Sequence, residues 1–131
     1  MSNLFPMLII FSYSLVINSV APALKLFQSG YNISVGISSL IPLFSLVGTV
    51  LSNIFVGIYL NKLGLKRALL IGFGITIFGS LIIAFSNTLA LSLVGMLIFG
   101  FSSGFGFTSS TMLLAQSKNA NFGFYHGAYG L

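Results

Sequence analysis

Charged residues divide the chain into three long uncharged runs. Residues 1–24, 26–61 and 68–117 carry no charged side chain, and Lys25, a basic cluster at 62–67 and Lys118 interrupt or close them. A helix needs roughly 20 apolar residues to cross the hydrocarbon core of a membrane. The first run therefore predicts a helix over about residues 4–24. The second begins with a polar, turn-prone stretch at 28–32 and predicts a helix over about 35–60.

The third run is too long for one crossing and has the right length for two. Its polar cluster Ser86-Asn87-Thr88 is placed to divide it, so we expect helices over about 66–85 and 89–116. Residues 119–131 follow and contain an apolar stretch too short to span, which we interpret as the start of a fifth helix. The pattern predicts a single, incomplete transmembrane domain over residues 1–131, because its last apolar run is cut off by the chain end.

The composition agrees with a membrane protein. Of the 131 residues, 56% are hydrophobic and only 4% are charged, whereas soluble domains carry about 25% charged residues. The mean hydropathy is +1.10. We therefore expect an all-α fold, a polytopic bundle of transmembrane helices. A cleaved signal peptide is the alternative for the first segment, but that segment lacks a basic beginning and is followed directly by further spans.

The residue types that are missing exclude most chemistry. The chain has one His and no Asp, Glu or Cys. It therefore lacks paired catalytic carboxylates, a carboxylate to orient a catalytic histidine, and an acidic cage for Ca²⁺ or Mg²⁺. A single histidine cannot hold zinc or an iron–sulfur cluster. We expect no enzyme activity, no cofactor and no metal, and the bases are too few and too scattered to bind nucleic acid.

The positions of the bases predict the orientation in the membrane. If the N-terminus is cytoplasmic, the loop after the second helix and the loop after the fourth helix are also cytoplasmic, and only Lys25 lies outside. This asymmetry follows the positive-inside rule. The sequence thus predicts a multi-pass protein of the cell (plasma) membrane with its N-terminus inside. The cytoplasmic bases are Lys62, Lys66, Arg67 and Lys118.

Small residues recur at a spacing of four, which places them on one helical face. Such pairs let helix backbones approach closely in a membrane, where packing replaces the hydrophobic effect between helices. They indicate either helices that slide against each other or ordinary bundle packing. The pairs are Gly48 with Ser52, Gly100 with Gly104, and Gly123 with Gly127.

The loop between the second and third predicted helices carries a more specific pattern. Residues 57–67 read G-I-Y-L-N-K-L-G-L-K-R, with two glycines and an asparagine at fixed distances from three bases. The stretch resembles the signature loop of the major facilitator superfamily, G-x-x-x-D-[RK]-x-G-[RK]-[RK]-[RK]. In that family the loop controls conformational gating. The corresponding positions here are Gly57, Asn61, Lys62, Gly64, Lys66 and Arg67.

Three positions depart from the family pattern. Asn61 replaces the acid that helps to lock the outward-open state, and Leu65 replaces a base. The resemblance implies a weaker or differently made lock, because asparagine brings no charge. Met96 stands where many proton-coupled members carry an arginine, so a usual marker of proton coupling is missing.

Other segments fit the same resemblance. The glycine-rich stretch 100–106 is similar to the family's fourth helix, and the end of the chain, 124–130, resembles the start of the fifth helix in the sugar-transporting branch related to fucose–proton symporters. Family members have two six-helix halves, each built from inverted three-helix repeats. The resemblance therefore covers the N-terminal part of a transporter, with a weak hint of a sugar substrate.

Polar residues inside the predicted helices are candidates for a substrate path, because intramembrane polar groups usually face the bundle interior or a wet cavity. The alternative is that the serines and threonines bond to their own helix and that Asn18 bridges two helices. His126 is the only residue whose type changes charge near neutral pH. It is a candidate for a proton site, a hydrogen bond to a hydroxylated substrate, or a plain helix cap. The substrate-path candidates are Tyr13, Asn18, Ser103, Ser110 and His126.

The function that these observations favour is transmembrane transport. We expect the N-terminal portion of a major facilitator secondary transporter, which moves a small solute by alternating access and is inactive as this fragment alone. Its expected partners are membrane lipids, a small-molecule substrate that is sugar-like if the hint holds, and the remainder of its own chain. The alternative is a small four-helix structural or assembly subunit of a membrane complex. The last apolar segment, which is too short to span the membrane, is unfavourable for such a finished subunit.

Overall fold

The computed structural model describes residues 4–116 and 121–130, and every regular element in these ranges is a helix. Four helical segments of the described chain are long and apolar enough to cross a membrane: Leu4–Tyr31, Val35–Leu63, Leu65–Ala84 and Leu89–Ala115. The predicted all-α transmembrane bundle is thereby confirmed. The base predicted after the fourth helix, Lys118, lies outside the described residues.

Two of the four segments are interrupted, each shortly before a proline. The first consists of α1 (Leu4–Asn18) and α2 (Val20–Tyr31), and the second of α3 (Val35–Ser38) and α4 (Leu40–Leu63). Proline lacks a backbone N–H, and its ring clashes with the carbonyl group four residues earlier. Pro22 and Pro42 lie four residues after the last residues of α1 and α3, so each releases one carbonyl and breaks the helix there.

The predicted end of the first helix near residue 24 is wrong, because the helix continues through the polar stretch to Tyr31. The hydroxyl of Ser29 donates to the carbonyl oxygens of Lys25 and Leu26, both at 3.1 Å, and so bonds within the helix. Asn32 then ends it in a left-handed conformation with φ of 51°, which asparagine tolerates better than most residues.

The other helix ends lie nearer to their predicted positions. The second segment ends at Leu63 instead of 60, and α5 (Leu65–Ala84) and α6 (Leu89–Ala115) begin and end within one residue of the predicted bounds. Thr88 caps α6 by accepting a hydrogen bond from the Leu91 backbone N–H at 3.3 Å. The last helix, α7, runs from Phe122 to Gly130, so it starts later than the predicted 119.

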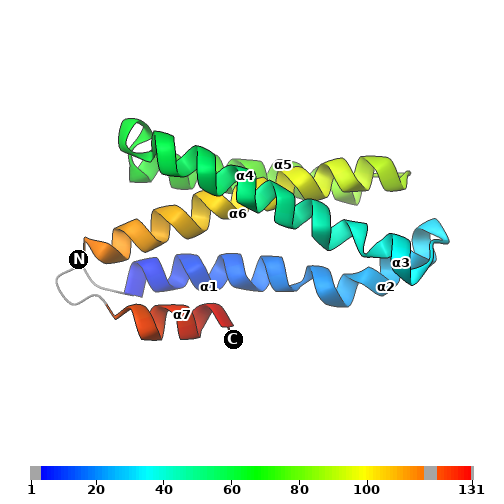
Figure 1. Cartoon of the computed structure of the whole chain (residues 1–131), viewed down its shortest axis with the longest axis horizontal. Coiled ribbons are helices and arrows are strands. Elements are labelled where there is room, and N and C mark those ends of the chain that lie inside the picture. Colours follow the sequence, from blue (N-terminus) through cyan, green and yellow to red (C-terminus); the bar gives the residue numbers. More distant parts are fainter. Residues whose placement is uncertain (1–3, 117–120, 131) are drawn as a thin grey trace.

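Helix α6 lies at the centre of the bundle. It packs against α4 and α5 on one side and against α1 on the other, and α7 packs beside α1 (Figure 1). In its most apolar stretch, 56% of the residues are buried, against 22–28% in the other three spans. The fold is therefore organised around α6, and the other three spans leave most of the residues in their most apolar stretches unburied.

Glycines set the distance between α6 and its neighbours. A Cβ atom at Gly100 would overlap the carbonyl oxygen of Ser45, and one at Gly48 would overlap that of Leu97. Gly104 likewise contacts Ser52 too closely to accommodate a side chain. Two of the three predicted small-residue pairs thus form the α4–α6 contact. The third does not form a comparable contact among described residues, since Gly127 has open space where its Cβ would be.

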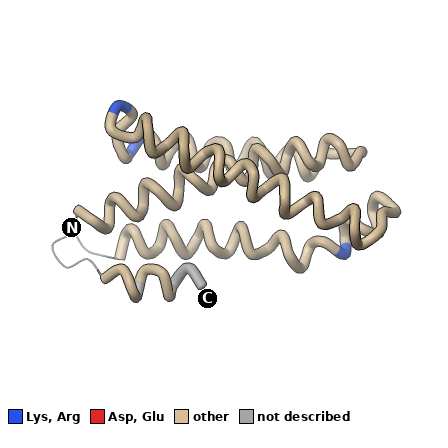
Figure 2. The backbone as a smooth tube through the Cα atoms, in the orientation of Figure 1, with Lys and Arg blue, Asp and Glu red and all other residues tan. Residues whose placement is uncertain are grey.

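The four basic residues of the described ranges lie toward the ends of the bundle. Figure 2 shows Lys and Arg positions where α4 turns into α5 and, toward the opposite end, on α2. Gly64 alone connects α4 to α5, with φ of 78° and ψ of 147°, a conformation that is essentially restricted to glycine. The tight turn therefore holds the bases on both its sides close together.

Candidate functional site

Two adjoining cavities lie between α1, α4 and α6. The larger has a volume of about 240 Å³ and the smaller one of about 190 Å³. They share the side chains of Ile17, Thr49 and Ser103. Their linings contain no charged residue, so any solute held there would meet apolar groups, hydroxyls and one amide. The other lining residues are Val20, Pro42, Ser45 and Leu46 for the larger cavity, and Ile10, Tyr13, Asn53 and Phe107 for the smaller.

A pair of hydroxyl groups forms the wall that both cavities share. The hydroxyls of Thr49 and Ser103 lie 2.7 Å apart. Each also lies within hydrogen-bond distance of a backbone carbonyl oxygen, Ser103 of that of Gly100 at 2.6 Å and Thr49 of that of Ser45 at 3.0 Å. Because each hydroxyl has a single hydrogen, one of the two donates to the other hydroxyl while the second donates to a carbonyl. A hydroxyl has two acceptor lone pairs besides its one hydrogen, so both groups can still accept from a solute.

One turn further along α4, an amide takes the place of the hydroxyl. The Asn53 side-chain oxygen accepts from the Thr108 hydroxyl at 3.1 Å. Because Thr49 and Asn53 are four residues apart, they lie on the same face of α4. Two further hydroxyls on these helices, those of Ser52 and Ser109, are buried without a hydrogen-bond partner among the described residues. This face of the α4–α6 contact therefore offers both donors and acceptors inside an apolar bundle.

Tyr13 contributes an aromatic wall to the smaller cavity. Its ring lies 5.3 Å from that of Phe73, and it fills the space that a side chain at Gly106 would need. The Tyr13 hydroxyl faces Thr76, but the two groups fall outside hydrogen-bond geometry. Tyr13 thus wedges α1 against α5 and α6 while one edge of its ring borders the cavity.

Three other predicted path residues do not line either cavity. Asn18 is exposed and donates to the hydroxyl of Ser14 at 3.1 Å, a hydrogen bond within α1. Ser110 is buried and pairs with the hydroxyl of Tyr125 at 2.7 Å. His126 is exposed on α7, with its ring 6.2 Å from that of Phe107. Of the five predicted residues, the structure brings Tyr13 and Ser103 together at the cavities.

The six predicted gating residues do lie together, at the turn between α4 and α5. Gly57, Asn61 and Lys62 lie in the last two turns of α4, Gly64 forms the turn, and Lys66 and Arg67 begin α5. All six are exposed, and Gly57 has open space around the position of a Cβ. The turn thus presents a basic surface, with one neutral amide at Asn61, to whatever lies beyond this end of the bundle.

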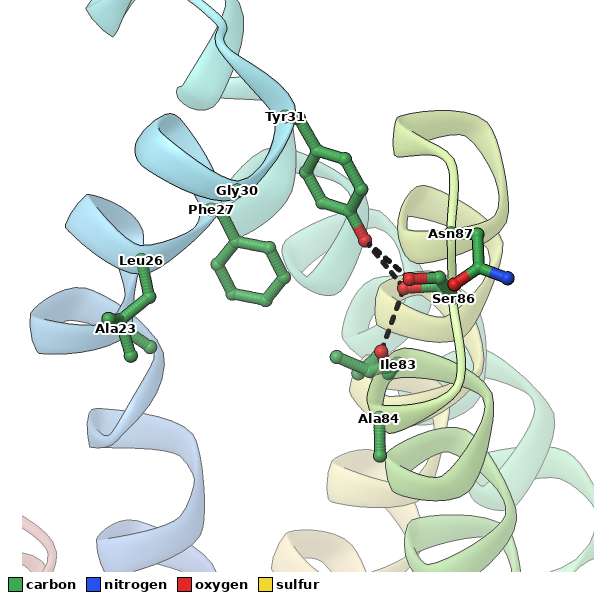
Figure 3. A pocket seen from close by; sticks show the side chains of 9 residues that line it. All are labelled: Ala23, Leu26, Phe27, Gly30, Tyr31, Ile83, Ala84, Ser86 and Asn87. Carbon is green, nitrogen blue, oxygen red and sulfur yellow. Dashed lines mark hydrogen bonds between the residues drawn. The ribbon is translucent and has the colours of Figure 1, made fainter.

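At the opposite end, a third cavity of about 610 Å³ opens between α2 and the end of α5. Figure 3 shows Tyr31 reaching from α2 toward Ser86 across its upper edge. The Tyr31 hydroxyl lies 2.6 Å from the hydroxyls of both Ser86 and Ser92. This hydroxyl cluster ties the end of the first span to the connection between α5 and α6.

Sequence reasoning missed three polar residues of the site: Thr49, Asn53 and Thr108 as hydrogen-bonding partners across the α4–α6 contact. For the two residues of α4, the spacing in the sequence could have identified them. Thr49 and Asn53 are four residues apart and therefore share one helix face, and Asn53 is the one amide in the middle of the second span.

Comparison with known proteins adds one positive finding. The family model described as Major Facilitator Superfamily matches residues 2–131. No curated protein and no solved structure matches the chain significantly.

Proposed function

The chain belongs to the major facilitator superfamily, and on that premise we propose that α1, α4 and α6 border the path of a small polar solute. The family consists of membrane transporters. In this proposal the solute binds near the midplane and the transporter exposes it to one side of the membrane and then to the other, as in alternating access. We further propose a plasma-membrane location with the α4–α5 turn and the N-terminus in the cytoplasm.

The observation that carries this proposal is the pair of adjoining cavities that share Thr49 and Ser103. Their polar groups are hydroxyls and an amide, and no charged side chain lines them. In a low-dielectric interior, neutral hydrogen-bonding groups suit an uncharged, hydroxylated solute, since an ion would lose its hydration without a counter-charge. A sugar-like substrate fits this lining.

Replacing Ser103 by alanine tests the path. We expect uptake of a labelled neutral hexose into proteoliposomes to fall about tenfold, because the loss of one hydrogen bond costs up to about 1.5 kcal/mol. The protein for this experiment is the full-length natural protein that contains these 131 residues. Ser12→Ala is the matched control, because Ser12 is exposed on α1, bonds only to the Leu8 carbonyl oxygen, and lines neither cavity.

Equal uptake by the Ser103→Ala and Ser12→Ala proteins would contradict the proposed path. Residues 1–131 alone serve as a further comparison. The family's transporters have twelve helices in two halves, and the described residues contain four spans. We therefore propose that the 131 residues alone do not transport, and uptake above that of empty liposomes would overturn this.

The α4–α5 turn is the proposed gate. An acid at the position of Asn61 would add the charge that this chain lacks, so Asn61→Asp should favour the outward-open state. Because the chain has no cysteine, a single cysteine introduced in place of Ile17, which lines both cavities, reports access from outside. We expect its alkylation to be about fivefold faster with Asn61→Asp. An unchanged or slower rate, or labelling from the cytoplasmic side, would refute the assignment.

His126 is proposed to lie at the rim of the path, beside Phe107. Histidine as a residue type changes charge between pH 5 and 8, but His126 lines neither cavity. We therefore expect His126→Ala to lower hexose uptake by less than about twofold and to leave the pH profile from 5 to 8 unchanged. If the variant lost an inflection that the parent protein shows in this range, His126 would be a proton site.

A further inference from the structure

An apolar groove runs between the beginnings of α1 and α5 and the end of α6. Its volume is about 560 Å³. A single polar side chain, that of Lys66, stands in its lining, so nothing in the groove could orient a polar solute by hydrogen bonds from several sides. The other lining residues are Phe5, Ile9, Leu65, Leu69, Leu70, Phe73 and Leu113.

The charge at one end of this groove has no counterpart within the chain. Lys66 and Arg67 lie in the first turn of α5, and Lys62 lies in the last turn of α4. A helix N-terminus carries partial positive charge and favours anions, so bases there are unfavourable by themselves. These 131 residues contain no Asp or Glu, so none of their side chains can compensate the bases. The compensating anion must therefore come from outside these 131 residues.

We propose that this groove binds an anionic phospholipid, with an acyl chain along the apolar lining and the phosphate at Lys66. The juxtaposition of a long apolar lining with one cation at its edge matches the two chemical halves of such a lipid. A free phosphate would leave the apolar groove empty. A second copy of this chain could fill the groove but brings no acid to Lys66. The assignment does not depend on which solute the protein transports.

Native mass spectrometry of the detergent-purified protein tests the headgroup. Phosphatidylglycerol and phosphatidylcholine with identical acyl chains are the probes, and we expect preferential retention of phosphatidylglycerol. Lys66→Gln should lower that retention about fivefold, the effect of one base near a lipid phosphate. Lys62→Gln is the matched control, because Lys62 is also exposed at the same turn but does not line the groove; its effect should be less than about twofold.

Equal losses in the two lysine variants would reduce the preference to a general attraction of the basic end and overturn the site. Unchanged phosphatidylglycerol retention in both lysine variants would also overturn the site. So would equal retention of phosphatidylglycerol and phosphatidylcholine by the parent protein. Because Lys66 and Lys62 are exposed, neither substitution disturbs the buried core, and an unchanged elution volume verifies this.

A separate variant tests whether an acyl chain occupies the apolar lining of the groove. Leu70 lines the groove and is exposed, so Leu70→Trp should fill part of the groove and lower phosphatidylglycerol retention at least threefold. Leu81 is exposed on the same helix outside this groove, and Leu81→Trp should have no effect. A photoreactive phosphatidylglycerol in vesicles should label the lining of α1 and α5. Labelling elsewhere, or exclusion of the label by a protein helix seated in the groove, would refute the lipid as occupant.

Discussion

Replacing Gly100 by alanine is expected to destabilise the bundle by about 3 kcal/mol, the upper end of the range for an overpacked contact. The added Cβ would overlap the Ser45 carbonyl oxygen and crowd the Ser45 Cα, which would lie 2.7 Å away. The obstructing atoms belong to the backbone and cannot rotate aside, so α4 and α6 must separate. The measurement is the apparent Tm of the detergent-solubilised protein, read as the fraction that stays monodisperse after heating.

Gly74→Ala provides the control for this prediction. Gly74 is an exposed helical glycine of α5, and apart from its own stretch of helix no described atom lies within 4 Å of the position of a Cβ. Alanine is the better helix former by roughly 1 kcal/mol, so this variant should melt at the same temperature as the parent protein or slightly higher. If the Gly100 and Gly74 variants melted together, the close α4–α6 approach would not hold in the solubilised protein.

Much of the helix layout follows from the sequence by local rules. The charge-free runs locate the four spans, and Ser86-Asn87-Thr88 divides the third run as predicted. The two interruptions also follow from local chemistry, since the last residue of the helix before each one lies four residues before a proline. The one large error, the end of the first span, arose because Gln28, Ser29 and Gly30 are polar or flexible. Polar side chains that can bond to their own helix, or that lie near its end, do not force it to stop.

The site was less accessible to sequence reasoning, because it depends on which face of each helix meets which neighbour. The spacing of Ser14 and Asn18 places them on one face of the first helix, and they do bond to each other. Neither of them, however, lines the cavities, although their helix neighbours Ile10 and Ile17 do. Thr49 and Asn53 have the same spacing and do face α6. The spacing alone does not separate the two pairs; the close approach of α4 and α6, which their glycines allow, brings Thr49 and Asn53 within hydrogen-bond distance of α6.

The contact between α1 and α6 makes a second strong prediction, because it depends on one aromatic ring. Gly106→Ala should cost about 2 kcal/mol in the parent protein, since the new Cβ would overlap the ring of Tyr13. In a Tyr13→Ala background the ring is gone, and the same substitution should cost less than about 0.5 kcal/mol. The coupling of about 1.5–2 kcal/mol lies within the range for residues in direct contact. Apparent Tm values of the four proteins give this double-mutant cycle.

Gly79→Ala shows whether that coupling is specific. Its Cβ would lie 2.8 Å from the backbone nitrogen of Phe99, and Tyr13 is not among its near neighbours. Its cost should therefore be the same with and without Tyr13. Equal coupling of Tyr13 to both glycines would mean that losing the ring loosens the whole bundle, and Tyr13 would not be the wedge between α1 and α6. If only Gly106 couples, this ring sets the separation of α1 from α6, and with it the width of the smaller cavity that both helices border.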